Sequence, residues 1–155
     1  MPIERVRYQY VDQQRTRVNI YVDIKDPEGF NAYVFSIQRF KKDTLLDSDI
    51  TNDYRFIPNR SQLFSDREFQ GKTHTFVIEN IDIEVYLGRN SVLTDNLKVT
   101  LFNLSKPTYD LFLSFNTSEP TLGDPFFEPS VISNQVKNGL GVFGTYSSST
   151  YSLIL

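Results

Sequence analysis

The feature that most constrains the fold is a strict alternation of apolar and polar residues in several short runs. In the clearest run, Val18, Ile20, Val22 and Ile24 are separated by single, more polar residues. The same period of two recurs over residues 6–10, 32–42, 73–79 and 97–104. Successive side chains of a strand point to opposite faces, so this period predicts strands with one buried face and one wetter face.

Turn-forming residues separate these runs. The polar segment 12–15 predicts a hairpin between the first two strands, and 25–31 is a stronger break with proline and glycine. Residues 41–62 are expected to form a long exposed connection, and 118–129, with its prolines, a loop or a sheet edge. Residues 63–69 are ambiguous, and 81–87 either extend the preceding strand past a bend or form a separate one. The tail is expected to close as a hairpin, with 142–143 and 151–155 as its arms and serines 147–149 as its turn.

Residues 105–116 are the one helix candidate. Ser105 is a good N-cap, Pro107 suits a first turn, and Asp110 lies early, where a negative charge is favoured. A strand with alternating inward residues over 109–115 matches the pattern about equally, and the start signals favour the helix. The expected fold is therefore mainly β, a single domain over 1–155. It would be an antiparallel β-sandwich or open barrel-like sheet with one short helix near 105–116.

Composition excludes several classes of protein. The chain has 155 residues and no cysteine, which excludes disulfide scaffolds, cysteine-ligated metals and thiol nucleophiles. A formal charge of −3 argues against nucleic-acid binding, which needs a basic surface. No apolar leader follows Met1, and no apolar run approaches the roughly 18 residues of a membrane-spanning helix. We expect the chain by itself to be soluble.

Two motifs are similar to ligand-binding loops but lack their context. Residues 139–144 satisfy G-x-G-x-x-G, yet only 11 residues follow, too few for the strand and helix of a dinucleotide site. We interpret these glycines as structural. Asp47, Asp49 and Asp53 form a weak calcium candidate. The EF-hand pattern fails at Asn52 and Pro58, so a solvated acidic loop is the preferred interpretation.

Candidate catalytic groups are few. His74, the one histidine, alternates with threonines on the side of Phe76 and Ile78, which predicts a structural histidine among apolar neighbours. Asp82 and Glu84 would share one strand face at about 7 Å, a spacing that inverting glycosidases use. Alternating acidic residues more often mark a wet face. We expect no catalytic residue, no resident metal and no cofactor, and we expect most of the aromatic residues to lie in the core.

Several segments resemble one bacterial family in order and spacing from about residue 17 to 146. Residues 64–76 are similar to its F-x-D-x-x-F-x-G-K-x-Y-x-L pattern, 101–109 to L-x-x-L-S-x-x-x-Y, and 26–33 to D-P-x-x-x-N-x-Y. His74 stands where an aromatic residue is commoner. The closing E-P…S-N…N-G-L-G-x-F signature is the most specific part, here carried by Glu128, Pro129, Asn134, Asn138, Gly139, Gly141, Phe143 and Gly144. The family is the domain of unknown function 4249 family.

The resemblance implies a setting and a type of function. Its members are lipoproteins of the outer membrane, encoded near TonB-dependent receptors, and the chain corresponds to their C-terminal half. It lacks the lipobox cysteine, so contact with the membrane would be made only through a lipid anchor that is absent here. We expect a non-enzymatic binding or accessory module of the cell envelope, with loops 43–62 and 118–130 as contact surfaces. The alternative is a carbohydrate- or peptide-binding module, with or without calcium. A sheet edge left open by the missing half would be a template for pairing with another chain.

Overall fold

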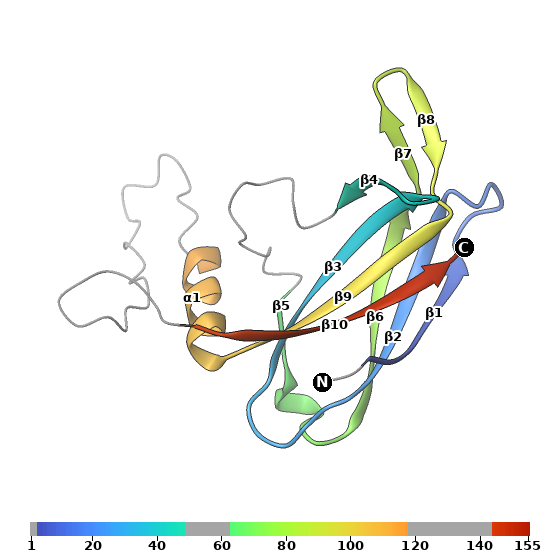
Figure 1. Cartoon of the computed structure of the whole chain (residues 1–155). Coiled ribbons are helices and arrows are strands. Elements are labelled where there is room, and N and C mark those ends of the chain that lie inside the picture. The colour runs from blue at the N-terminus through green and yellow to red at the C-terminus, as the bar shows by residue number, and fades with distance from the viewer. Residues whose placement is uncertain (1–2, 49–62, 118–143) are drawn as a thin grey trace.

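Two antiparallel sheets face each other in the computed structural model, which describes residues 3–48, 63–117 and 144–155. Figure 1 shows β3, β9 and β10 running in front of β1, β2 and β6, with a hairpin at one end and one helix at the other. The predicted fold class, mainly β and sandwich-like with one short helix, is confirmed. Within the described ranges, no helix is long and apolar enough to cross a membrane.

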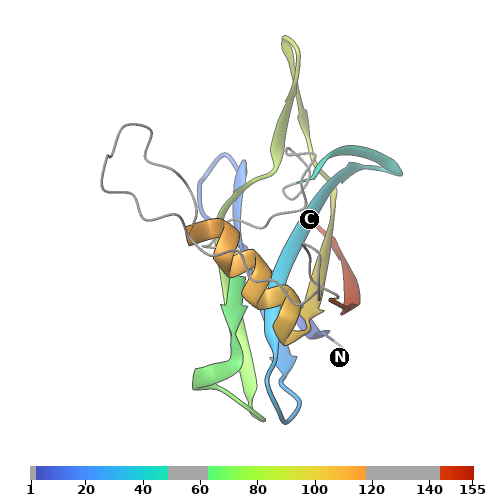
Figure 2. The ribbon, with the colours of Figure 1, turned by 90° about the vertical axis from the view of Figure 1, so that its left-hand side faces the viewer.

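The first sheet has the strand order β1–β2–β6, with β1 at Ile3–Tyr10, β2 at Arg17–Lys25 and β6 at Thr73–Asp82. β1 and β2 form the predicted hairpin, in which Tyr10 lies opposite Val18. The alternating apolar residues of β2 are all fully buried, as the period of two predicts. The opposite face of this sheet is polar, and no described helix covers it (Figures 1 and 2).

The polar outer face of this sheet holds a chain of three side chains. Arg7 on β1 pairs with Asp23 on β2 at 2.9 Å, and the hydroxyl of Thr75 on β6 donates to the same carboxylate at 2.7 Å. The hydrogen bond from Thr75, followed by the one from Arg7, holds the pKa of Asp23 below its ordinary value of 3.8.

We expect Asp23→Asn to lose a modest pH-dependent stabilisation of about 0.5 kcal/mol. Because the folded-state pKa is lowered, the stabilisation is present above about pH 4 and is lost as the pH falls through the folded pKa. Thermal melts of wild type and variant should differ at pH 7 and converge near pH 2–3. A difference between the two melting temperatures that persists at pH 2 would contradict the assignment.

The second sheet has the order β10–β9–β3–β4, and β5 also pairs with β3. Its strands are β3 (Ala32–Lys41), β4 (Thr44–Ser48), β5 (Leu63–Ser65), β9 (Asn96–Leu104) and β10 (Tyr146–Ile154). β3 is central and its first six residues are all buried, so both of its faces are covered there. β3 pairs with β9 along one edge and with β5 and β4 at successive positions along the other.

A separate two-stranded hairpin, β7 (Glu84–Leu87) and β8 (Asn90–Leu93), projects beyond both sheets (Figure 1). Gly88 has φ +68° at the first position of its two-residue turn, a conformation that favours glycine. Ile83, fully buried, anchors the base of the hairpin: its N–H donates to the Thr16 carbonyl and its carbonyl accepts from Thr94 N–H, both at 2.8 Å. Residues 84–87 therefore form a separate strand, the second of the two predicted alternatives.

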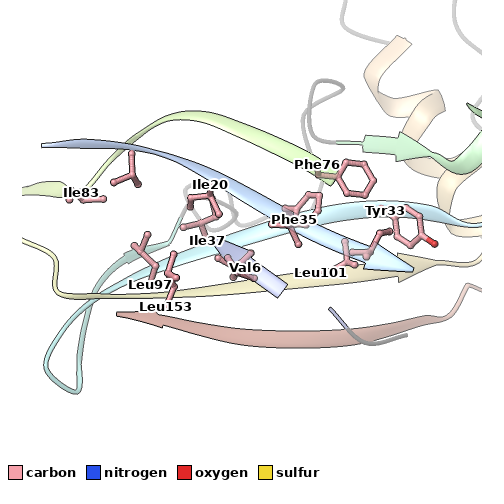
Figure 3. Close-up of a cluster of buried hydrophobic side chains, with 14 of the residues drawn as sticks. Val6, Ile20, Tyr33, Phe35, Ile37, Phe76, Ile83, Leu97, Leu101 and Leu153 are labelled. Carbon is pink, nitrogen blue, oxygen red and sulfur yellow. The ribbon is translucent and has the colours of Figure 1, made fainter. Parts of the chain in front are cut away.

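The main core lies between the two sheets (Figure 3). Aliphatic residues such as Ile20, Ile37 and Leu97 fill one part of it. Aromatic rings fill the part nearer β5, where Phe76 of β6 meets the rings of Phe35 and Phe64 of the opposite sheet, each at 5.1 Å between centroids. The buried aromatic residues of the described ranges are Tyr33, Phe35, Phe69, Phe76 and Phe112, so the core accounts for part of the aromatic enrichment of the sequence.

The predicted helix forms as α1 (Lys106–Thr117), directly after β9. The Ser105 carbonyl accepts the Tyr109 N–H at 3.0 Å, and Lys106 pairs with Asp110 one turn along at 2.7 Å. Phe112 and Tyr109 pack with Ala32, Val34 and Leu104 in a second, smaller core. In Figure 2, which views the molecule from the side of α1, the helix crosses in front of the sheets.

Two sequence predictions were wrong. The segment 41–62 is not irregular at its start, because residues 44–48 form β4 and pair with β3. The tail is not a hairpin around serines 147–149, because β10 runs through them and pairs with β9 along its whole length. Serine is a common turn residue, but here a ready partner strand provides the hydrogen bonds that a turn would otherwise provide. The ambiguous residues 63–69 form β5 and a single 3₁₀ turn, Asp66–Glu68.

Candidate functional site

Two clefts lie side by side at the end of the sandwich from which the hairpin projects. Asp82, Glu84 and Tyr86 form a wall that both clefts share. On one side the wall faces Arg39 and β4, enclosing about 540 Å³. On the other side it faces the β1–β2 turn, again enclosing about 540 Å³. Both clefts are open to solvent and combine carboxylates with an aromatic ring.

Arg39 forms the floor of the first cleft. β3 directs this side chain inward, and its guanidinium is buried beside the cleft. Its Nε donates to the backbone carbonyl of Asp82 at 2.5 Å, and its Nη1 lies 3.5 Å from Asp47 Oδ2. The arginine therefore links the two sheets and places a positive charge beside Asp47.

The second cleft is held by carboxylate contacts at its rim. Asp82 accepts a hydrogen bond from Arg17 at 2.7 Å, which raises the pKa of that guanidinium. Asp12 accepts from the backbone N–H of Thr16 at 2.8 Å and from its hydroxyl, and the hydroxyl contact lowers the pKa of Asp12. These contacts fix the β1–β2 turn against the shared wall. The arrangement offers hydrogen-bond acceptors to a ligand that carries donors.

Exposed apolar side chains mark the hairpin beside these clefts. Tyr86 is 72% exposed, Leu87 48% and Leu93 46%. The sequence pattern did not predict these residues as a contact surface. The available signal was a Gly88-Arg89 turn between two short apolar runs, and in the sequence alone such runs are typical of buried strands.

Two of the three candidate catalytic residues come together, and the third lies apart. Asp82 and Glu84 line the same clefts, with buried Ile83 between them. His74 lies toward the other end of β6 and lines a different hollow. Its ring stacks on Phe69 at 4.0 Å and meets Phe76 at 4.7 Å, so the prediction of apolar neighbours is confirmed.

The calcium candidate is described only in part. Asp47 lies on β4, 3.5 Å from the buried guanidinium of Arg39, and Asp49 and Asp53 lie outside the described residues. A cation at Asp47 would meet the positive charge of Arg39. In the ranges that the structure describes, no group of three or more acidic or histidine side chains is placed to hold a metal ion. Calcium binding through these three aspartates stays a prediction.

Most of the closing signature also lies outside the described residues, from Glu128 to Phe143, as does the expected contact loop 118–130. Gly144 is described and lies against α1. A Cβ added at Gly144 would come within 2.0 Å of the Thr108 hydroxyl and 3.1 Å of Thr108 Cβ. The residue two positions before β10 thus lies so close to the helix that a side chain there would force Thr108 to shift.

The other signature segments meet in a buried polar network at the α1 end. Asp66, after β5, accepts the backbone N–H of Asn31 at 2.8 Å and its side-chain N–H at 3.2 Å. The Asn31 side chain in turn accepts from Asn103 on β9 at 2.9 Å. Asp66 is 2% exposed and Asn31 6%. The network ties the 26–31 loop to the segment before β6 and to β9.

The Asp26 carboxylate is the acceptor of a second group of hydrogen bonds in the same region. It accepts the backbone N–H of Gly71 at 2.8 Å and a hydrogen bond from the buried hydroxyl of Tyr33. Burial, and then the contact with Asp26, raises the pKa of Tyr33. Tyr33 and Gly71, which lie far apart in the sequence, therefore share one carboxylate.

Comparison with protein families decides the classification. A family model described as a domain of unknown function (DUF4249) matches residues 1–152. The chain belongs to this family. No curated protein and no solved structure matches it. In this DUF4249 member, three signature segments meet in the buried network: 26–33, 64–76 and 101–109. Their hydrogen bonds join distant parts of the chain and so stabilise the fold. The clefts and the hairpin lie at the opposite end, outside those segments.

Proposed function

We propose that this chain is a non-enzymatic binding module of a bacterial outer-membrane lipoprotein and that it assists a TonB-dependent transporter. The observation that carries the proposal is the β7–β8 hairpin, which projects from the sandwich with exposed Tyr86, Leu87 and Leu93. The family resemblance supplies the lipoprotein and transporter setting. The structure supplies the surface on which a partner would bind.

The chemistry of the hairpin suits contact with another protein. An isolated two-stranded hairpin is marginally stable in water. Exposed apolar residues on it therefore add no stability until a partner protein buries them. Tyrosine is enriched at interfaces because it combines a large apolar ring with a polar end. The carboxylates Asp82 and Glu84 at the base would contribute the polar rim.

The proposal predicts that the double substitution Tyr86→Ser/Leu87→Ser abolishes partner recovery. The full-length native protein is captured from membranes and the co-purifying proteins are identified by mass spectrometry. We expect a TonB-dependent receptor with wild type and at least a tenfold smaller yield with the variant, since loss of two interface anchors costs several kcal/mol. Tyr146→Ser/Ile154→Ser, on exposed residues of β10, is the matched control and should retain the receptor.

A clean preparation with no receptor would count against this function. A receptor that both double variants retain would place the contact elsewhere on the molecule.

The second candidate, a carbohydrate-binding module, is favoured by one observation: exposed Tyr86 shares a cleft with Asp47, Asp82 and Glu84. An aromatic face beside carboxylate acceptors suits a sugar ring with its hydroxyl donors. Glycan arrays with and without calcium would then be the next measurement.

A further inference from the structure

The sandwich is closed on one side and grooved on the other. On the closed side the edge strands β1 and β10 meet, where Ile3 N–H donates to Ser149 Oγ at 3.2 Å. On the other side the edges β6 and β5 are separated by a groove of about 400 Å³, lined by Leu63–Ser65 of one strand and His74–Val77 of the other. In the described part of the chain no strand pairs with the outer edge of β6 or of β5.

The floor of this groove is aromatic. Phe64 and Phe76 meet across it at 5.1 Å, and Phe69 stacks with His74 beside them at 4.0 Å. Phe69 and Phe76 are buried, whereas Phe64 and His74 are half-exposed toward the groove. A side chain entering the groove would therefore meet ring faces and edges, which favour an apolar residue.

The first six residues of β6 lack the devices that usually block strand addition, whereas Glu79, Asp82 and an irregular register beside Asn80 lie beyond them. Edge strands are normally protected by charged residues, proline or short length. β1 carries Glu4, Arg5 and Arg7, and β4 is only five residues long. By contrast, Thr73–Ile78 of β6 has six consecutive residues without a carboxylate, lysine, arginine, proline or glycine, four of them β-branched. Such a segment is a strong template for pairing.

We propose that the groove between β5 and β6 binds a short extended peptide segment of a partner protein, which adds to β6 as a strand. Unpaired backbone N–H and C=O groups along an edge can be paired in series only by another extended backbone. The aromatic floor selects an apolar side chain at alternate positions, and Glu68 at the rim disfavours an acidic one. Because the groove lies away from the β7–β8 hairpin, this inference does not depend on the proposed function.

The groove also sets the length of the peptide. β5 spans three residues, about 10 Å at the usual rise of a strand, so three or four residues of the peptide would lie between both edges. The rest would pair with β6 alone, along Thr73–Ile78. This length suits a linear segment and is too small for a folded domain.

The test uses nine-residue peptides and a single fluorescent label. The leading probe copies Arg17–Lys25, because this alternating sequence already pairs with the inner edge of β6. Further probes are three other alternating peptides, a scrambled copy, and a copy with proline at two positions. Since the chain has no cysteine, Ser65→Cys at the groove wall accepts one environment-sensitive dye.

We expect saturable binding of at least one alternating peptide and none of the scrambled or proline copies. Val77→Lys places a lysine on the β6 edge, at a position that lines the groove and is 47% exposed, and should weaken binding at least tenfold, while Val77→Thr retains it. Val11→Lys is the matched control, with the same 47% exposure away from the groove, and should bind as wild type does. Thermal melts verify that each variant is folded.

Three outcomes would overturn the proposal. The first is that no alternating peptide binds better than the scrambled copy. The second is peptide binding that Val77→Lys leaves unchanged, because the peptide would then have replaced β2 in the sheet and not added to the outer edge of β6. The third is a dimer, seen by sedimentation without peptide and dissolved by Val77→Lys, because the occupant would then be a second copy of this chain.

Discussion

Asp66→Ala should lower the free energy of unfolding by about 3 kcal/mol, the largest effect expected of any single polar substitution here. The carboxylate is buried and accepts both the backbone and the side-chain N–H of Asn31. Its removal leaves the buried backbone N–H of Asn31 without its acceptor, which costs about 1–3 kcal/mol. The side-chain amide of Asn31 also loses one acceptor but still reaches the carbonyls of Pro27 and Gly29. Urea denaturation followed by circular dichroism measures the change, with the slope of the transition unaltered.

Asp110→Ala is the matched control for this substitution. Asp110 also accepts from a neighbouring side chain, Lys106 at 2.7 Å, but as a partly exposed pair within one helix. Its loss should cost no more than about 0.5 kcal/mol. Equal effects of the two substitutions would show that the buried network adds nothing beyond a surface ion pair.

Phe76→Ala should cost about 4 kcal/mol, within the usual range for removing a buried phenylalanine ring. Phe76 is 5% exposed and lies within 6 Å of five other rings, those of Tyr33, Phe35, Phe64, Phe69 and His74. The same denaturation experiment measures the loss. A near-ultraviolet circular dichroism signal that falls at the same time would report the loosened aromatic cluster.

The neighbouring residue provides the control. Val77 follows Phe76 on the same strand but points to the opposite, exposed face, so Val77→Ala should change stability by less than about 0.5 kcal/mol. If Phe76→Ala costs less than about 1 kcal/mol, the rings do not pack as a core, and the groove floor proposed for peptide binding is not rigid.

The molecule separates its structural and contact features by position. The signature segments of the family lie in the buried network near α1, and the clefts and the exposed hairpin lie at the other end of the strands. Substitutions in the network are therefore expected to act through stability. Substitutions such as Tyr86→Ser are expected to act on binding, with little effect on stability, because the side chain is mostly exposed.

Local pattern determined most of the secondary structure. The alternation at 18–24 can bury one face only if the chain is extended, so β2 follows from the sequence alone. The sequence favours the helix less strongly, because a strand pattern matches 109–115 about equally well and only the start signals Ser105, Pro107 and Asp110 favour α1. Membership of the DUF4249 family was likewise readable from motif order, without any structure.

Other features depend on contacts between distant residues, and local pattern does not contain them. Serines 147–149 are turn formers, yet they are strand because β9 offers a partner along its whole length. Nothing in the sequence indicates that Phe64 and Phe76 meet across a groove. Nor does it indicate that Asp66 accepts hydrogen bonds from Asn31. The sequence by itself determined the strands that alternate strictly, the helix and the family to which the chain belongs, because these depend on neighbouring residues. The tertiary structure alone decided which edges have no partner strand among the described residues, where the hairpin projects and which carboxylates are buried, because burial and pairing depend on residues far apart in the chain.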